Sequence, residues 1–262
     1  MSRQVTEVIE NMVEHSESAA LAFRDVVKSF YVKDTFIPIL KGVTAAVAPG
    51  DIVALIGPSG SGKSTLLSLC NLLITADAGK VFVDGINVLD WNITELRRKV
   101  GLVFQTPTIF PGTVRTNIEL ARVLQGDTFN QPERYLQNVG LSADLLDHEA
   151  SELSGGQKQR VALARVLATE PKVLLLDEVT SALDPSAARD VEEWILHIHE
   201  KNKTTMLWVT HNLEQALRVS HWVWLMIGGQ LIEVTETRQF FTSPQTELGR
   251  LFLQGELNGQ RI

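Results

Sequence analysis

The chain has 262 residues, of which 44% are hydrophobic and 21% charged, a composition typical of a folded globular protein of one or two domains. With 24 basic and 31 acidic residues the formal net charge is −7, which argues against a nucleic-acid partner because phosphate contacts need a basic face. The longest apolar stretch, residues 222–227, is far shorter than the roughly 20 residues that cross a bilayer, so any membrane role is expected to pass through a partner chain. A single cysteine and the lack of a signal-like N-terminus predict a reducing, cytosolic compartment.

The first part of the chain is predicted to contain antiparallel sheet. Residues 1–20 are expected to form an extension, because glutamates recur at helical spacing beside apolar residues and predict a loosely attached helix with an acidic face. The sequence Asp84-Gly85 suits the positive φ angles of a tight hairpin turn. The predicted strands here are residues 21–27, 43–47, 52–56, 80–83 and 86–88.

The rest of the chain alternates between short apolar runs and helical segments. The runs at 100–104, 173–176 and 205–209 lack polar alternation, which favours parallel strands buried on both faces. Residues 222–227 and 230–234 flank Gly228-Gly229 and predict a second hairpin. Strand signals are missing between Thr106 and about Leu167. The pattern therefore predicts an α/β fold with an inserted α-helical segment.

A glycine-rich loop is the sharpest motif of the sequence. It reads Gly57, Pro58, Ser59, Gly60, Ser61, Gly62, Lys63, Ser64 and Thr65. This run fits the phosphate-loop pattern G-x-x-x-x-G-K-[ST], after a strand and before a helix, where glycines let backbone N–H groups surround a phosphate. Lys63 is expected to neutralise the β- and γ-phosphates and the Ser64 hydroxyl to ligate Mg²⁺. Cys70, in the apolar helix that follows, is expected to be a small core residue.

Two carboxylates follow the apolar run 173–176. Asp177 and Glu178 stand at the C-terminal end of a predicted buried strand, the edge where open α/β sheets bind ligands. Asp177 is suited to hold Mg²⁺ through its water shell, and Glu178 to polarise the water that attacks the γ-phosphate. Such a pair alone is as often a helix cap, but with the phosphate loop present the catalytic interpretation is preferred.

A third motif, residues 153–157, completes a recognisable order. Ser154 is a competent helix N-cap, and the two glycines after it allow a phosphate to approach the helix closely. This motif follows the phosphate loop and Gln105, and it precedes the carboxylate pair, residues 181–184 and His211. That order of motifs resembles the nucleotide-binding domain of the ATP-binding-cassette (ABC) family. The resemblance covers about residues 21–234.

The resemblance implies a site shared between two chains. In the family the signature segment contacts the γ-phosphate of ATP held by the other subunit, so Ser154 and Gly156 are expected to act in trans. Gly155 and Gln157 belong to the same nucleotide-contacting segment. Asp184 is expected in the loop that joins the two sites across the dimer.

Further roles follow from the same resemblance. Gln105 is expected to touch Mg²⁺ and the attacking water and to report nucleotide state to the helical subdomain. His211 matches the histidine that bonds the γ-phosphate, although a lone histidine at the end of a strand is more often structural. The aromatic residue that stacks on adenine is expected at Phe30, which is the better match by its spacing to Leu40, or at Tyr31.

The family implies a RecA-like parallel-sheet core, an antiparallel β subdomain and an inserted α-helical subdomain. The expected domains are residues 1–20 (extension), 21–240 (cassette, with a helical subdomain at about 106–167) and 241–262 (tail). The expected cofactors are ATP and Mg²⁺, and the expected partners are a second cassette and integral membrane permease subunits at the cytoplasmic face of the cell membrane. A soluble, non-transport ABC ATPase is the alternative class, disfavoured because residues 106–152 carry no sustained heptads and the chain has one phosphate loop.

The cargo is predicted less sharply, because a cassette does not touch it. Residues 105–114, 177–184 and 207–211 resemble the small cassettes of iron or other metal export systems. Phosphate and amino-acid importers share much of the same sequence, including residues 240–244 near the end. The motif segments therefore favour metal export over phosphate or amino-acid import by a narrow margin.

Overall fold

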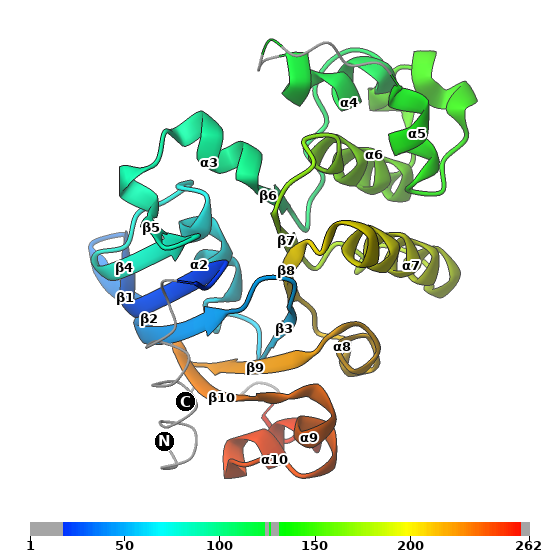
Figure 1. Cartoon of the computed structure of the whole chain (residues 1–262). Coiled ribbons are helices and arrows are strands. Elements are labelled where there is room, and N and C mark those ends of the chain that lie inside the picture. The colour runs from blue at the N-terminus through cyan, green and yellow to red at the C-terminus, as the bar shows by residue number, and fades with distance from the viewer. Residues whose placement is uncertain (1–17, 124–125, 127–130, 258–262) are drawn as a thin grey trace. The chain divides into compact units, whose positions relative to one another are not determined.

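The computed structural model describes residues 18–123, 126 and 131–257, and the chain divides into two compact units (Figure 1). The first unit comprises residues 1–96 and 205–262, and the second residues 97–204. The helix predicted within residues 1–20 lies, up to residue 17, outside the described residues. Across the described ranges, no helix combines the length and the apolar character that a membrane crossing requires.

An antiparallel sheet forms the outer part of the first unit, in the order β2-β1-β4-β5 (Figure 1). Its strands are β1 (Leu21–Val32), β2 (Thr35–Val47), β4 (Ala78–Val83) and β5 (Ile86–Asn87). The β4–β5 turn has φ 47° at Asp84 and 74° at Gly85, which confirms the predicted hairpin. β1 and β2 are longer than predicted, because they continue to a tight turn in which Lys33 and Asp34 both have positive φ.

A second group of strands holds the core of the first unit. β3 (Ile52–Ile56) pairs in parallel with β8 (Thr205–Val209) on one side and with β9 (Trp222–Ile227) on the other. Every residue of β3 and β8 is buried, which for β8 confirms the prediction of a strand covered on both faces. β10 (Gln230–Glu236) runs antiparallel to β9 after Gly228 and Gly229, both at positive φ, so the second predicted hairpin is also confirmed.

Helices complete the first unit. They are α2 (Lys63–Cys70), α8 (Leu213–Val219), α9 (Thr237–Thr242) and α10 (Glu247–Leu253), with a 3₁₀ turn at Val88–Asp90 and α3 (Ile93–Lys99) at the division between the units. Cys70 is fully buried and its Sγ donates to the Leu66 carbonyl, so the thiol is a core group as predicted. Burial raises the pKa of the Cys70 thiol well above its usual range.

The second unit pairs two parallel strands with a group of helices. β6 (Val100–Val103) lies beside β7 (Val173–Asp177). The helices are α4 (Val114–Val123), α5 (Pro132–Gln137), α6 (Gly155–Leu167) and α7 (Pro185–Asn202), with 3₁₀ turns at Ala143–Asp147 and Ala150–Glu152. Among the described residues between 106 and 167 there is no strand, which agrees with the helical insertion predicted there. α4 and α5 both pack against α6 (Figure 1).

Candidate functional site

The phosphate loop joins β3 to α2 and depends on backbone conformations that glycine alone adopts easily. Gly57, Gly60 and Gly62 have φ of 143°, 78° and 101°. At Gly57 a Cβ would lie 1.9 Å from the carbonyl oxygen of Met226, so a side chain there has no room. At Gly60 a Cβ would meet nothing within 4 Å. The loop is therefore packed against β9 at its start and open at its middle.

Lys63 lies at the first turn of α2 with its side chain folded over the loop. Its buried Nζ donates to the carbonyl oxygens of Gly57 and Pro58, both at 2.9 Å, and to the Ser61 Oγ at 3.4 Å. These three contacts hold the ammonium above the loop. A phosphate entering the loop meets a positive charge already in position.

The other predicted nucleotide contacts of the first unit lie on its surface. The ring of Phe30 is 38% exposed and lies 5.3 Å from the Lys28 ammonium. Tyr31 is 77% exposed and contacts Phe36 edge-on. His211 follows the buried strand β8 and is exposed. Two aromatic rings and an imidazole thus lie at the surface of this unit.

In the second unit the structure brings Gln105 and Glu178 together. The Gln105 Nε2 donates to the Glu178 Oε2 at 2.9 Å, although the two residues are 73 positions apart. Glu178 has φ 49°, and its carbonyl oxygen accepts from the Ser181 N–H and Oγ–H at 3.0 and 2.8 Å. Asp177, the last residue of β7, is 8% exposed. The carboxylate pair therefore stands at the end of the strand, with Glu178 held in a rarely adopted conformation.

The segment at 154–157 opens α6 with a complete capping box. The Ser154 Oγ accepts from the Gln157 N–H, and the Gln157 side chain accepts from the Ser154 N–H at 2.9 Å. A Cβ at Gly155 would meet nothing within 4 Å, whereas one at Gly156 would lie 3.0 Å from Leu183. The N-terminus of α6 is thus a formed, accessible helix end with room for an anion at Gly155.

Asp184 has a structural role that the sequence analysis did not include. It is the N-cap of α7, and its Oδ1 accepts from the N–H groups of Ser186 and Ala187, both at 3.0 Å. The Ala187 and Ser186 N–H groups hold the pKa of the Asp184 carboxyl below its usual value. A role for Asp184 across a dimer would be additional to this cap.

Three polar residues that the sequence analysis missed anchor the segment after β6. The buried Gln159 Nε2 donates to the Phe104 carbonyl, next to Gln105. Asn117, 1% exposed, accepts from the Phe110 N–H and donates to the Phe110 carbonyl, both at 2.9 Å.

The third of these residues is Arg165, which reaches the same segment from α6. Its Nη2 donates to the Thr108 carbonyl at 2.8 Å, and its guanidinium lies 4.8 Å from the Phe110 ring centre. Burial lowers the pKa of Arg165. The sequence signal was polar residues within the amphipathic helices α4 and α6, because a polar group on the buried side of such a helix needs a partner.

Each unit carries oxygen groups of the kind that magnesium prefers. In the first unit Ser64 supplies an exposed hydroxyl at the start of α2, and in the second unit Asp177 and Gln105 supply a carboxylate and an amide. Within the described parts of the chain, no group of three or more His, Cys, Asp or Glu could hold a metal ion by itself. Mg²⁺ commonly binds through one or two protein oxygens with phosphate and water completing its shell, so the oxygen groups of either unit fit its chemistry.

Comparison with known proteins identifies relatives over most of the chain. The family model described as "ABC transporter" matches residues 40–181. The putative ABC transporter ATP-binding protein YjkB of Bacillus subtilis (strain 168) is 47% identical over 236 residues, covering 90% of this chain and 94% of the relative. The methionine import ATP-binding protein MetN of Vibrio vulnificus (strain YJ016) is 37% identical over 246 residues, covering 91% of this chain and 71% of the relative.

A solved structure agrees in fold. The dimeric, post-hydrolysis state of the ATP-binding cassette MJ0796, bound to ADP and Pi, matches with a TM-score of 0.77 and 30% sequence identity. The match covers 83% of this chain and 99% of that one. The predicted combination of parallel and antiparallel sheets with helices is therefore confirmed.

Proposed function

The chain belongs to the ABC transporter family as an ATP-binding cassette, and on that premise we propose that it hydrolyses ATP to drive transport through a separate membrane permease. The observation that carries the proposal is the phosphate loop. Its three glycines adopt positive φ, and it has a buried lysine above it. The likeness to a cassette bound to ADP and Pi supports hydrolysis as well as binding.

ATP binding begins at the phosphate loop. The Lys63 ammonium exchanges its carbonyl contacts for the β- and γ-phosphate oxygens, where the attraction between full charges is stronger. The backbone N–H groups of the loop and the N-terminus of α2 add further donors. Phe30, or alternatively Tyr31, stacks on the adenine ring.

Glu178 is the proposed base for hydrolysis. A carboxylate fixed by its backbone and by Gln105 can orient a water and draw off its proton as the water attacks the γ-phosphorus. His211 donates to the γ-phosphate oxygen on which charge accumulates. Mg²⁺, when bound, neutralises phosphate charge, and Ser64, Asp177 and Gln105 would hold it.

Two chains are proposed to sandwich two ATP molecules. Residues Ser154, Gly155, Gly156 and Gln157 of one chain face the γ-phosphate held by the other, with the accessible N-terminus of α6 as the anion site. Asp184 lies in the loop that links the two sites. The dimeric state of MJ0796 supports this arrangement.

The permease is proposed to dock beside Gln105, with the assembly at the cytoplasmic face of the membrane. Phe110 is 42% exposed, while Asn117 bonds its backbone and the Arg165 guanidinium covers one side of its ring. A half-exposed aromatic ring on a fixed backbone is a suitable contact for a short helix of a membrane partner. The same anchored segment begins at Gln105, which contacts Glu178.

For the cargo, we propose import of a small solute such as an amino acid, because the relative MetN is named for methionine import. Metal export is the second candidate and rests on the motif segments alone. Transport assays with purified permease, comparing methionine with ferrous iron, separate the two. Cargo-independent hydrolysis with no permease partner would instead favour the soluble class.

The test of hydrolysis uses Glu178→Gln and Lys63→Ala, with Glu152→Gln as the control for removing an exposed carboxylate from the same unit. Glu178→Gln should retain ATP binding and lower turnover by about 100-fold or more. Lys63→Ala should weaken ATP binding by about 2–5 kcal/mol. With ATP, the Glu178→Gln chain should shift toward dimer in sedimentation and return to monomer with ADP. Undiminished turnover in Glu178→Gln would overturn the assignment.

A further inference from the structure

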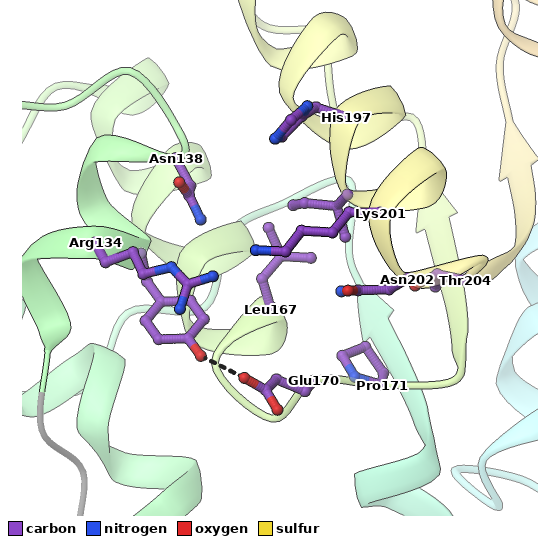
Figure 2. Close-up of a pocket in the computed structure, with 11 residues that line it drawn as sticks. Arg134, Asn138, Leu167, Glu170, Pro171, His197, Lys201, Asn202 and Thr204 are labelled. Atoms are coloured by element: carbon purple, nitrogen blue, oxygen red, sulfur yellow. Dashed lines mark hydrogen bonds between the residues drawn. The ribbon is translucent and has the colours of Figure 1, made fainter.

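A cavity of about 220 Å³ lies in the second unit and includes none of the residues assigned to nucleotide. α5, the segment between α6 and β7, and the C-terminal half of α7 form it (Figure 2). Its volume equals that of about seven water-sized groups. This is room for a small organic molecule rather than for a nucleotide.

Two cations face this cavity from different helices. Figure 2 shows Arg134 from α5 and Lys201 from α7 reaching toward each other across it. Over the residues that the structure describes, neither side chain has a hydrogen-bond or ion-pair partner, and Arg134 contacts only the ring of Tyr135, at 6.0 Å. Such a pair of facing cations attracts an anion between them.

One carboxylate limits the charge of that anion. Glu170 lies at the edge of the cavity, and its Oε1 accepts from the Tyr135 hydroxyl at 2.9 Å (Figure 2). Against Arg134 and Lys201, Glu170 leaves one net positive charge, which suits a monoanion and disfavours a doubly charged phosphate.

The remaining lining identifies the rest of the ligand. Leu167, Pro171 and Ile198 give the cavity an apolar wall that an inorganic ion would leave without a contact. The Asn138 and Asn202 amides supply neutral donors and acceptors beside it (Figure 2). The ligand therefore needs both a charged end and a short hydrocarbon body.

We propose that this cavity binds a small organic monocarboxylate, whose carboxylate bridges Arg134 and Lys201 while its hydrocarbon body packs on Leu167 and Pro171. A ligand held in this way ties α5 to α7. The cavity also lies at one end of β7 and at one end of α7, and the other ends of these two elements carry candidate-site residues. β7 begins just after Pro171 and ends at Asp177, and α7 runs from its Asp184 cap to the cavity.

The test titrates the full chain with sodium butyrate and follows the side-chain amide signals of Asn138 and Asn202 by NMR, with affinity from calorimetry. Butyrate should shift both signals, while n-butylamine and n-butanol, which lack the carboxylate, should not. Saturating ATP should not displace butyrate, because the cavity shares no residue with the nucleotide set. This readout does not depend on hydrolysis, so it fails or succeeds separately from the proposed function.

Four variants separate the cavity from general surface charge. Arg134→Gln and Lys201→Gln should each weaken butyrate binding about tenfold or more, and Glu170→Gln should tighten it several-fold by removing a repulsion. Lys172→Gln, an exposed lysine beside Pro171 that does not line the cavity, should change affinity less than about twofold. A gain of butyrate affinity in Glu170→Gln cannot come from misfolding.

Three results would each overturn the proposal. The first is no shift at Asn138 and Asn202 with butyrate. The second is an equal loss of affinity in Lys172→Gln and Arg134→Gln. The third is inorganic phosphate binding as tightly as butyrate, since this would indicate a nonspecific anion patch.

Discussion

Replacing Gly57 with alanine tests how closely the phosphate loop must approach β9. The new Cβ would stand 1.9 Å from the Met226 carbonyl oxygen and 3.0 Å from its carbonyl carbon, on a backbone with φ 143°. Gly60→Ala makes the same chemical change in the same loop, with φ 78° and nothing within 4 Å of the new carbon. The two variants therefore differ mainly in the collision with β9.

These distances give the expected difference in stability between the two variants. A positive φ costs an alanine about 1–2 kcal/mol at Gly60 and at least as much at Gly57, whose φ of 143° lies further from the left-handed helical region. At Gly57 the nearest atom belongs to the backbone, and a Cβ contact under 3.0 Å is essentially never observed, so strand or loop must move. Such overpacking adds about 1–3 kcal/mol. Gly57→Ala should therefore lower the free energy of unfolding by about 2–5 kcal/mol and Gly60→Ala by about 1–2 kcal/mol.

Chemical denaturation of the full chain measures both losses, and a fluorescent ATP analogue measures binding in the same variants. Because a displaced loop no longer surrounds a phosphate, Gly57→Ala should also bind nucleotide more weakly than Gly60→Ala. Equal losses of stability in the two variants would contradict this prediction, since the collision would then have no effect.

Two further predictions concern buried and paired carboxylates. Glu233 is fully buried and accepts from the Gln245 N–H at 2.7 Å and from the Thr246 N–H and Oγ–H at 3.0 and 2.6 Å. Glu233→Ala should therefore cost about 3 kcal/mol of stability and accelerate hydrogen exchange at Gln245 and Thr246, and unchanged exchange would contradict this. The Lys28 ammonium donates to the Asp77 carboxylate at 2.7 Å and holds the pKa of Asp77 below its ordinary 3.8. This pair therefore stabilises the folded protein above pH 3.8, the ordinary pKa. The stabilisation is lost as the pH falls through the lower pKa that Asp77 has in the folded protein. Asp77→Asn should therefore be less stable than the parent at neutral pH and equal to it in strong acid, and a pH-independent difference would contradict the assignment.

Strand prediction succeeded where burial is continuous. β3, β8 and β9 have the predicted bounds, because unbroken apolar runs between turn residues leave little choice. The strands β1 and β2 were both predicted too short, and the hairpin that joins them was not predicted. Its outer half is exposed, and register shifts between Phe23 and Ser29 break the alternation that identifies a strand from sequence.

The residue types of the candidate site are easier to identify from sequence than the contacts between them. A phosphate loop or a carboxylate pair is a local pattern, so sequence reveals it. The Gln105–Glu178 hydrogen bond joins positions 73 residues apart, and the cavity at Arg134 and Lys201 needs α5 and α7 to pack around a common segment. Such pairings depend on tertiary packing, which no single segment specifies.

The Gln105–Glu178 hydrogen bond also determines which substitution isolates the charge of the proposed base. Glu178 is fixed by its φ of 49°, by the Ser181 donors on its carbonyl, and by the Gln105 amide on its carboxylate. Glutamine at position 178 keeps a carbonyl oxygen that can accept from Gln105 and loses only the negative charge. Alanine would also release the Gln105 amide and so disturb a second candidate residue. A loss of turnover in Glu178→Gln with ATP binding retained therefore reports the missing charge rather than a collapsed site.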